Sequence, residues 1–210
     1  FERIVPLMIE AYDSSTDRDL KNKLKEPVDA MRTWDLRFSA ESVPTSLAVY
    51  FGQYLYRFSR EVSVVPGYTI FDAFADGLTP GKFLRAFTAA VEKLEDDFGT
   101  WQTPWGEINR YQRLTGDIRQ AFNDDEPSFP VFFTSSRWGS LASFGARTYP
   151  GTKKMYGTSG NSFVAFVEFG EKVKAKSILA GGISGDPDSP HFDDQVDMYI
   201  NGKFKDVLYY

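Results

Sequence analysis

The chain has 210 residues, and its 24 Lys and Arg against 29 Asp and Glu give a formal charge of −5. Hydrophobic residues make up 42% of it and aromatic residues 16%, which excludes general disorder and supplies enough apolar surface for a buried core. The chain has no cysteine and one histidine, His191. This excludes disulfides, thiolate zinc sites and histidine pairs, so neither a metal nor a cofactor is expected.

Charge and hydropathy also exclude two kinds of partner. No apolar run reaches the roughly 18 residues that a membrane-spanning helix needs. Lys and Arg are scattered among carboxylates, which argues against a nucleic-acid groove. We therefore expect no membrane span and no nucleic-acid partner.

The first half of the chain has the patterns of helices. Apolar residues at near-helical spacing predict a helix over residues 19–34, with a kink or short break at Pro27. Ser42 followed by Pro44 predicts a helix start, and an apolar stripe runs on from there to Phe58.

Two further segments complete this half. Residues 62–79 contain Pro66-Gly67 and Asp76-Gly77, which predict a connecting loop. Thr79-Pro80 then predicts a helix of about five turns that ends at Gly99.

The second half has the patterns of strands. After an extended segment over residues 100–130, strands are predicted at 131–133, 162–169, 172–179 and 204–209. Gly170-Glu171 is the predicted hairpin turn, and 193–200 a short helix. The alternation in 172–179 indicates one solvated face, whereas 162–169 is apolar enough to be covered on both faces. This order predicts an α+β fold, with a mainly helical segment over 1–115 and a strand-rich segment over 116–210.

Common catalytic and nucleotide-binding motifs are missing. Neither phosphate-binding glycine pattern occurs, and the acidic residues between Asp186 and Asp197 lack the spacing of a calcium loop. A small hydrolase using His191 is conceivable, but there is no G-x-S-x-G elbow to present a serine, and a structural imidazole in a turn is the simpler interpretation. The aromatic residues allow two interpretations, a groove for a sugar or acyl group or packing alone; the candidate ligand contacts, beside Tyr111, are Trp101, Trp105 and Trp138.

Three ordered motifs carry a resemblance to a known family. They are Gly157-Thr158-Ser159-Gly160-Asn161-Ser162-Phe163 running into Glu168, the run from Ala180 to Gln195 that includes Gly185 and Ser189-Pro190-His191, and Tyr199-Ile200-Asn201-Gly202-Lys203-Phe204. Together they resemble the C-terminal part of the large subunit in the penicillin acylase family. Penicillin, cephalosporin, aculeacin-type and acyl-homoserine-lactone acylases belong to this family.

The resemblance implies an N-terminal-nucleophile amide hydrolase made by self-cleavage of a precursor. Its new N-terminal serine attacks the amide carbonyl with its own α-amine as base, and an acyl-enzyme forms. The side chain of Phe1 has no nucleophilic atom. The resemblance therefore places the nucleophile outside these residues, and we expect no catalytic residue and no activity in this chain alone.

The resemblance also implies roles and partners. The motif residues are expected to be structural, with Ser189 as a helix cap, Asp193, Asp194 and Gln195 in the first helical turn, and Gly157 to Ser162 turning the chain into a central strand. The motif residues expected to be structural are Gly157, Ser159, Gly160, Asn161, Ser162, Glu168, Gly185, Ser189, Pro190, His191, Asp194 and Gln195.

The expected partners are the small subunit, the N-terminal part of the large subunit and a small N-acyl substrate. These strands would complete a four-layer αββα core, and alone they would expose apolar edges and could self-associate. The resemblance further implies a periplasmic or secreted bacterial protein. The alternative is a non-catalytic module that binds sugars or acyl groups at the tryptophans.

Overall fold

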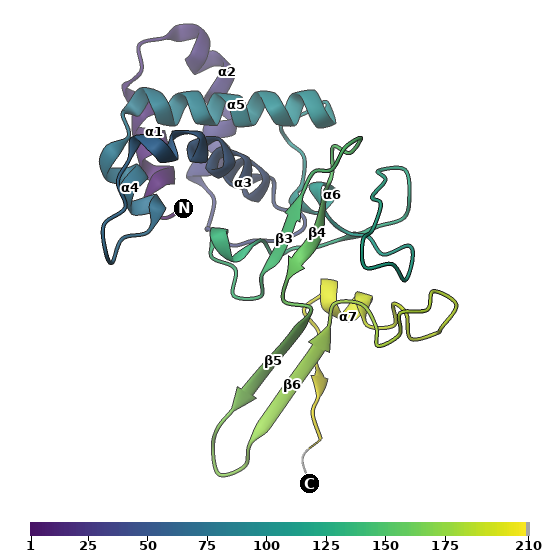
Figure 1. The fold of residues 1–210 in the computed structure, drawn as a ribbon. Coiled ribbons are helices and arrows are strands. Elements are labelled where there is room, and N and C mark those ends of the chain that lie inside the picture. Colours follow the sequence, from purple (N-terminus) through teal and green to yellow (C-terminus); the bar gives the residue numbers. More distant parts are fainter. Residues whose placement is uncertain (209–210) are drawn as a thin grey trace. The chain divides into compact units, whose positions relative to one another are not determined.

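Helices occupy the first half of the chain and strands the second in the computed structural model, which describes residues 1–208 (Figure 1). The predicted α+β class is confirmed. The chain divides into a helical unit, residues 1–38 and 42–104, and a sheet unit, residues 39–41 and 105 onward. The sequence patterns predicted this change eleven residues later, after residue 115. No helix within residues 1–208 is both long enough and apolar enough to span a membrane.

The helical unit is built around two long helices. Its elements are α1 (Ile4–Ser14), α2 (Arg18–Arg32), α3 (Val43–Leu55), the 3-10 helix η1 (Tyr56–Glu61), α4 (Ile70–Gly77) and α5 (Pro80–Phe98). Phe51 of α3 meets Phe87 of α5 edge to face, with ring centroids 5.7 Å apart. Both rings are fully buried, so this contact lies at the centre of the unit's core.

The capping signals at α3 and α5 are confirmed in position. The Ser42 side chain accepts a hydrogen bond from the Thr45 amide, 3.1 Å away. The helix α5 starts at Pro80 and ends before Gly99, whose φ of 79° is the left-handed conformation typical of a helix C-cap. The Thr79 side chain makes no capping bond.

The predicted break at Pro27 is wrong, because α2 runs through it without interruption. Proline has no amide hydrogen, so its helical bond to the preceding turn is lost. In α2, however, Pro27 lies on the buried stripe with Leu24, Val28 and Met31. Burial of this stripe stabilises the helix across the proline.

The predicted loop over residues 62–79 is also wrong in part, because α4 occupies residues 70–77. Thr69 and Asp72 form a reciprocal capping box: the Thr69 side chain accepts from the Asp72 amide, and the Asp72 carboxylate accepts from the Thr69 amide. Two ion pairs of 2.7 Å join Arg3 to Asp72 and Asp76. Local capping therefore overrides the turn signals that flank this short helix.

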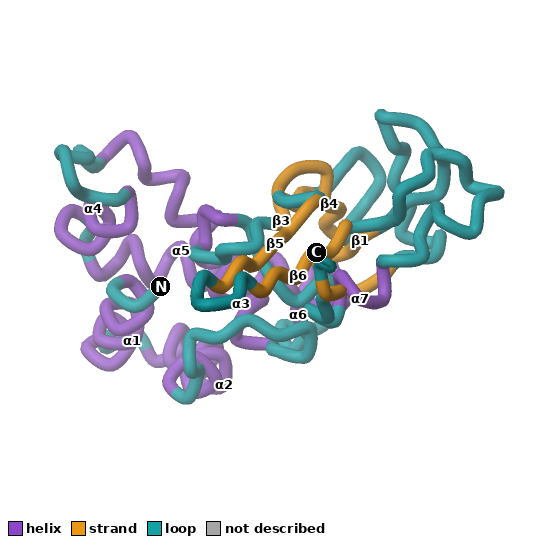
Figure 2. Tube along the Cα trace, turned by 90° about the horizontal axis from the view of Figure 1, so that it is seen from below, coloured by secondary structure: helices purple, strands orange, loops and turns teal. Residues whose placement is uncertain are grey.

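The sheet unit contains two sheets. The first has strand order β2-β1-β4-β3, with β1 and β4 parallel and the other pairs antiparallel. The second is antiparallel with order β5-β6-β7. The elements are α6 (Trp105–Ile108), β1 (Asn109–Tyr111), β2 (Phe129–Pro130), the 3-10 helix η2 (Ser136–Trp138), β3 (Phe144–Arg147), β4 (Met155–Gly160), β5 (Phe163–Glu168), β6 (Lys174–Leu179), α7 (Val196–Ile200) and β7 (Lys205–Asp206). Between β1 and β2 the chain is loop (Figure 2).

The hairpin of β5 and β6 is confirmed, but three details of the strand prediction are wrong. The connection is the five-residue loop 169–173, not a two-residue turn. The predicted strand 131–133 follows β2 as extended chain, held where the Asn109 side-chain amide donates to the carbonyls of Val131 and Phe133. The last strand is β7, which is only two residues long; residue 209 of the prediction lies outside the described residues.

The expected environment of β5 is wrong as well. Gly157 to Gly160 belong to β4 instead of forming a turn, and β5 lies at the edge of its sheet, not at its centre. Its apolar side chains are largely exposed, with Phe166 56% and the adjoining Phe169 84% accessible. Side-chain composition alone cannot tell which faces are covered, because cover depends on other segments packing there. An exposed apolar face of this kind is typical of an interaction surface.

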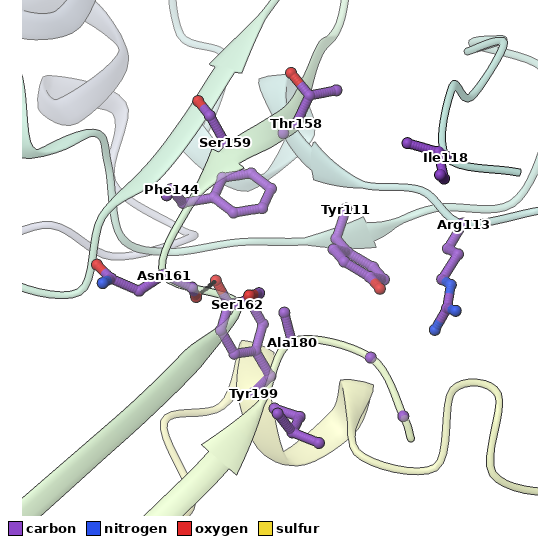
Figure 3. Close-up of a pocket in the computed structure, with 15 residues that line it drawn as sticks. Tyr111, Arg113, Ile118, Phe144, Thr158, Ser159, Asn161, Ser162, Ala180 and Tyr199 are labelled. Atoms are coloured by element: carbon purple, nitrogen blue, oxygen red, sulfur yellow. Dashed lines mark hydrogen bonds between the residues drawn. The ribbon is translucent and has the colours of Figure 1, made fainter. Parts of the chain in front are cut away.

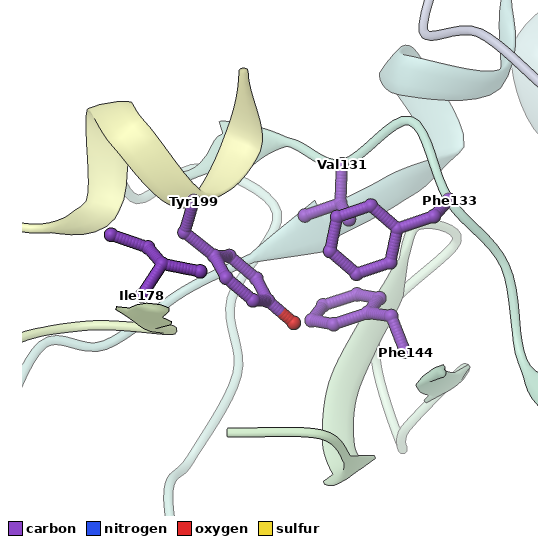
Figure 4. Close-up of a cluster of buried hydrophobic side chains, with 5 residues drawn as sticks. All are labelled: Val131, Phe133, Phe144, Ile178 and Tyr199. Atoms are coloured by element: carbon purple, nitrogen blue, oxygen red, sulfur yellow. The ribbon is translucent and has the colours of Figure 1, made fainter. Parts of the chain in front are cut away.

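A cluster of apolar residues joins the two sheets of the sheet unit (Figure 4). Its buried members are Val131, Phe133, Phe144, Ile178 and Tyr199. Phe133 lies at the middle of it, with ring centroids 6.1 Å from Phe144 and 5.1 Å from Tyr199. Because these rings come from β3, α7 and the segment after β2, they fix the walls of the cavity described next.

Candidate binding cavity of the sheet unit

A cavity of about 540 Å³ opens in the sheet unit (Figure 3). Three stretches of backbone meet there: the end of β1 and the loop after it, the end of β4 with its link to β5, and the end of β6. Its lining comprises Tyr111, Arg113, Ile118, Phe144, residues 157–162, residues 179–182 and Tyr199. All three family-like motifs therefore contribute to one cavity, the third through Tyr199.

Aromatic rings form one part of the wall. The centroids of Tyr111 and Tyr199 lie 6.4 Å apart, and the Tyr199 hydroxyl donates to the carbonyl of Asn161 at 3.3 Å. Burial raises the pKa of both tyrosines above the ordinary value. Both phenols therefore stay protonated at neutral pH and act as hydrogen-bonding groups, not as bases.

Arg113 is the one charged side chain among the described lining residues, and the sequence analysis missed it. Its Nη1 donates to the Phe192 carbonyl at 2.7 Å and its Nη2 to the Ser184 carbonyl at 2.8 Å. The guanidinium also lies over the Phe192 ring, 4.1 Å from its centroid. Arg113 thus anchors the loop after β6 and presents a cation at the cavity.

Glycine is required at two positions of this wall. Gly160 has a φ of 119°, and a Cβ there would come within 2.0 Å of the Ser143 carbonyl oxygen. A Cβ on Gly182 would lie 2.0 Å from the His191 carbonyl oxygen. Any side chain at either position would push two strands or loops apart.

The polar side chains of residues 157–162 bond to neighbouring segments. Thr158 shares a 2.8 Å hydrogen bond with the Tyr149 hydroxyl, and the Asn161 side-chain oxygen accepts from the Ser143 amide at 2.7 Å. The Ser159 hydroxyl lies 3.5 Å from the Gly145 carbonyl, and the Ser162 carbonyl accepts from the Ala180 amide. Further along β5, Glu168 is 3.8 Å from Lys174. None of these contacts activates a hydroxyl as a nucleophile.

The second motif forms a turn-rich loop before α7. The predicted cap and first turn are wrong there, because α7 begins at Val196, with Gln195 as its N-cap residue and no side-chain capping bond. Ser189 instead accepts a hydrogen bond from the His191 amide, next to Pro190. Gln195 is buried and accepts from the Leu179 amide at 3.3 Å, while its own amide donates to the Gly181 carbonyl. These bonds hold Gln195 against the end of β6, and the helix begins only after it. Gly185 lies earlier in the same loop, beside the segment that holds Gly116.

His191 is placed for structure more than for catalysis. Its Nδ1 lies 2.9 Å from an Asp194 carboxylate oxygen, and its side chain is 59% exposed. Within residues 1–208 no serine hydroxyl hydrogen-bonds to this ring, so the pair lacks a nucleophile. In the same described part of the chain, no three His, Asp or Glu side chains lie close enough together to hold a metal ion.

The three tryptophans named as ligand contacts lie away from the cavity lining. Trp101 belongs to the helical unit, and Trp105 and Trp138 belong to the sheet unit. Trp105 is only 2% exposed, so other residues cover its ring, and Trp101 and Trp138 are partly exposed. Contact of these rings with a ligand stays a prediction, and the cavity does not support it.

Comparison with known proteins identifies the family of the chain. The family model described as penicillin amidase matches residues 1–210, the full length of the chain. A search of curated proteins finds no match. The family match covers both units, and so it includes the cavity and the exposed sheet.

Proposed function

Because the chain belongs to the penicillin amidase family, we propose that the protein hydrolyses the linear amide bond of an N-acylated small molecule. The match over all 210 residues is the observation that carries the proposal. The reaction is acyl transfer: a serine oxygen bonds to the carbonyl carbon, the amine leaves with a proton, and water then releases the acid. β-Lactam side chains and acyl-homoserine lactones are the substrate classes that the resemblance names.

The nucleophile in this proposal is an N-terminal serine outside these residues, produced by self-cleavage of a precursor. The contacts of the sheet unit support that placement. The Thr158 hydroxyl bonds to Tyr149 and the Ser159 hydroxyl to the Gly145 carbonyl, and the His191–Asp194 pair has no serine partner among the described residues. The chain then contributes fold and not the reacting groups.

We further propose that the rest of the acylase covers the sheet of β5, β6 and β7. The apolar side chains of this sheet support the proposal, since they are exposed at Phe163, Phe166, Val167 and Phe169. Without that cover the same surface favours self-association. A periplasmic or secreted location belongs to the same proposal and comes from the family resemblance.

Hydrolysis assays test the function. Phenylacetyl, glutaryl and long-acyl amides of one chromogenic amine are offered to the complete precursor and, separately, to the 210-residue chain. We expect turnover of at least one amide by the processed precursor and none by the chain. Turnover by the chain alone would place the nucleophile within these residues, and no turnover of any amide by the precursor would contradict the activity.

A further inference from the structure

We propose that the cavity of the sheet unit binds a small monocarboxylate with an apolar body, and that Arg113 pairs with its carboxylate. The proposal does not depend on amide hydrolysis, because it concerns binding at a site without a nucleophile. It starts from the composition of the lining, where Arg113 is the one charged residue.

Arg113 has donors to spare and no acidic partner. Two of its hydrogen bonds go to the neutral carbonyls of Phe192 and Ser184, and a third joins it to the Tyr111 hydroxyl. No carboxylate of residues 1–208 forms an ion pair with it. A guanidinium carries five N–H donors, so these three bonds leave others for a ligand. In a chain with a formal charge of −5, a cation left without a carboxylate partner is well suited to an anion.

The guanidinium is also held in place before any ligand arrives. Two carbonyl bonds and the stack on Phe192 fix its plane. Gly181 makes this possible, because a Cβ there would lie 2.6 Å from the Tyr111 hydroxyl and 2.9 Å from Nη1 of Arg113. Figure 3 shows the Tyr111 hydroxyl and the Arg113 guanidinium on the same side of the cavity. A fixed, planar pair of donors favours a carboxylate, which it can bind through both oxygens.

The remainder of the wall selects the apolar body. Phe144, Tyr111 and Tyr199 contribute rings, and Leu179 and Ala180 contribute aliphatic surface. No Asp or Glu is found among the described lining residues, so nothing there repels a carboxylate. The volume of about 540 Å³ falls within the range of roughly 300–1,000 Å³ that small-molecule sites occupy.

Binding of 3-phenylpropanoate tests the proposal, with 3-phenylpropanamide as its neutral counterpart. Both probes are titrated into the protein by calorimetry and by NMR of the amides of Gly181 and Gly182. We expect the acid to bind at least about tenfold more tightly than the amide, as a charged hydrogen-bonded pair should. Equal affinity of acid and amide, or no saturable binding of the acid, would overturn the proposal without any variant.

Two variants with the same charge change give the matched comparison. Arg113→Met should remove the preference for the acid, while Arg119→Met, in the same loop but outside the lining, should leave it intact. Arg113→Lys retains the charge and should keep part of the preference. If Arg113→Met does not fold, Ala180→Leu reduces the cavity and should weaken both probes. Unchanged acid binding in Arg113→Met would overturn the assignment of this residue.

A second comparison distinguishes the source of the ligand. Acids of similar size are ranked by affinity and set beside the acyl groups that the precursor hydrolyses. Preference for the acid of the best substrate supports a product site, and affinity for acids in general supports a separate effector. Because binding is measured without turnover, the affinities of the acids can be interpreted even if the hydrolysis assay shows no activity.

Discussion

Gly160 shows how strongly one residue of the cavity wall constrains its sequence. Its φ of 119° is disfavoured for any residue with a side chain, and the Ser143 carbonyl occupies the place of a Cβ. The strain and the steric conflict act at the same point, where β4 ends against β3. The predicted structural role of Gly160 is therefore to let β4 end close against the Ser143 carbonyl.

We expect Gly160→Ala to lower the free energy of unfolding of the sheet unit by at least about 2 kcal/mol, because strain and collision add. Urea unfolding followed by near-ultraviolet circular dichroism measures it. Gly185→Ala is the matched control, since a Cβ at Gly185 meets nothing within 4 Å, and it should be close to neutral. Equal losses in the two variants would show that the Ser143 contact does not matter.

The place of Arg113 in the chain explains why the sequence did not predict it as a residue of the cavity. The motifs at residues 157–162 and 181–182 were recognised by their own spacing. Arg113 lies some 44 residues before the first of them, in a loop without periodicity, and it reaches the cavity because β1 pairs in parallel with β4. A parallel pairing of this kind is non-local and leaves no short-range pattern.

Among the elements, helices with both a cap and an apolar stripe were predictable, as α3 and α5 show. The errors at α2 and α4 arose where proline and glycine signals were given more weight than burial or capping. Thr69 and Asp72 carried the capping-box spacing, so the information for α4 was present in the sequence. The sequence did not contain the information on whether the faces of β5 are buried, because exposure depends on which segments pack against a strand.

The ion pairs of α4 lead to a prediction on pH. Hydrogen bonds from Arg3, followed by those from Thr69, lower the pKa of Asp72 from 3.8 to about 2. A carboxyl with a lowered pKa in the folded state stabilises it fully above pH 3.8, and this contribution is lost as the pH falls toward 2. We therefore expect the helical unit to lose stability across this window.

Asp72→Asn should flatten the pH dependence of that unit between pH 4 and pH 2, the window set by the two pKa values. Arg3→Gln should also reduce this loss of stability and confine it to the upper part of the window, because the pKa of Asp72 returns toward 3.8 when the largest cause of its lowering is removed. Thermal unfolding at a series of pH values, followed at amides of α4, gives the comparison. Curves that coincide for the parent and Asp72→Asn would contradict the role of this carboxylate.

For the whole molecule, the two units have separate buried cores. Phe51 and Phe87 lie in the core of the helical unit, and Phe133 and Ile178 in that of the sheet unit. The sheet unit also has the exposed apolar sheet, which gains stability only when something covers it. On this basis we expect the sheet unit to unfold first in the chain alone, and the two units to unfold in separate transitions.

Core substitutions in each unit test this separation. Phe87→Ala and Ile178→Ala each remove a buried side chain and should cost about 2–5 kcal/mol. Hydrogen exchange at the amides of Leu94 in α5 and Ile178 or its neighbours in β6 reports the units individually. We expect Phe87→Ala to accelerate exchange in α5 and Ile178→Ala in β6, each with little effect on the other. If either substitution accelerates exchange equally at both places, the chain unfolds as one cooperative body and the division into units has no thermodynamic meaning.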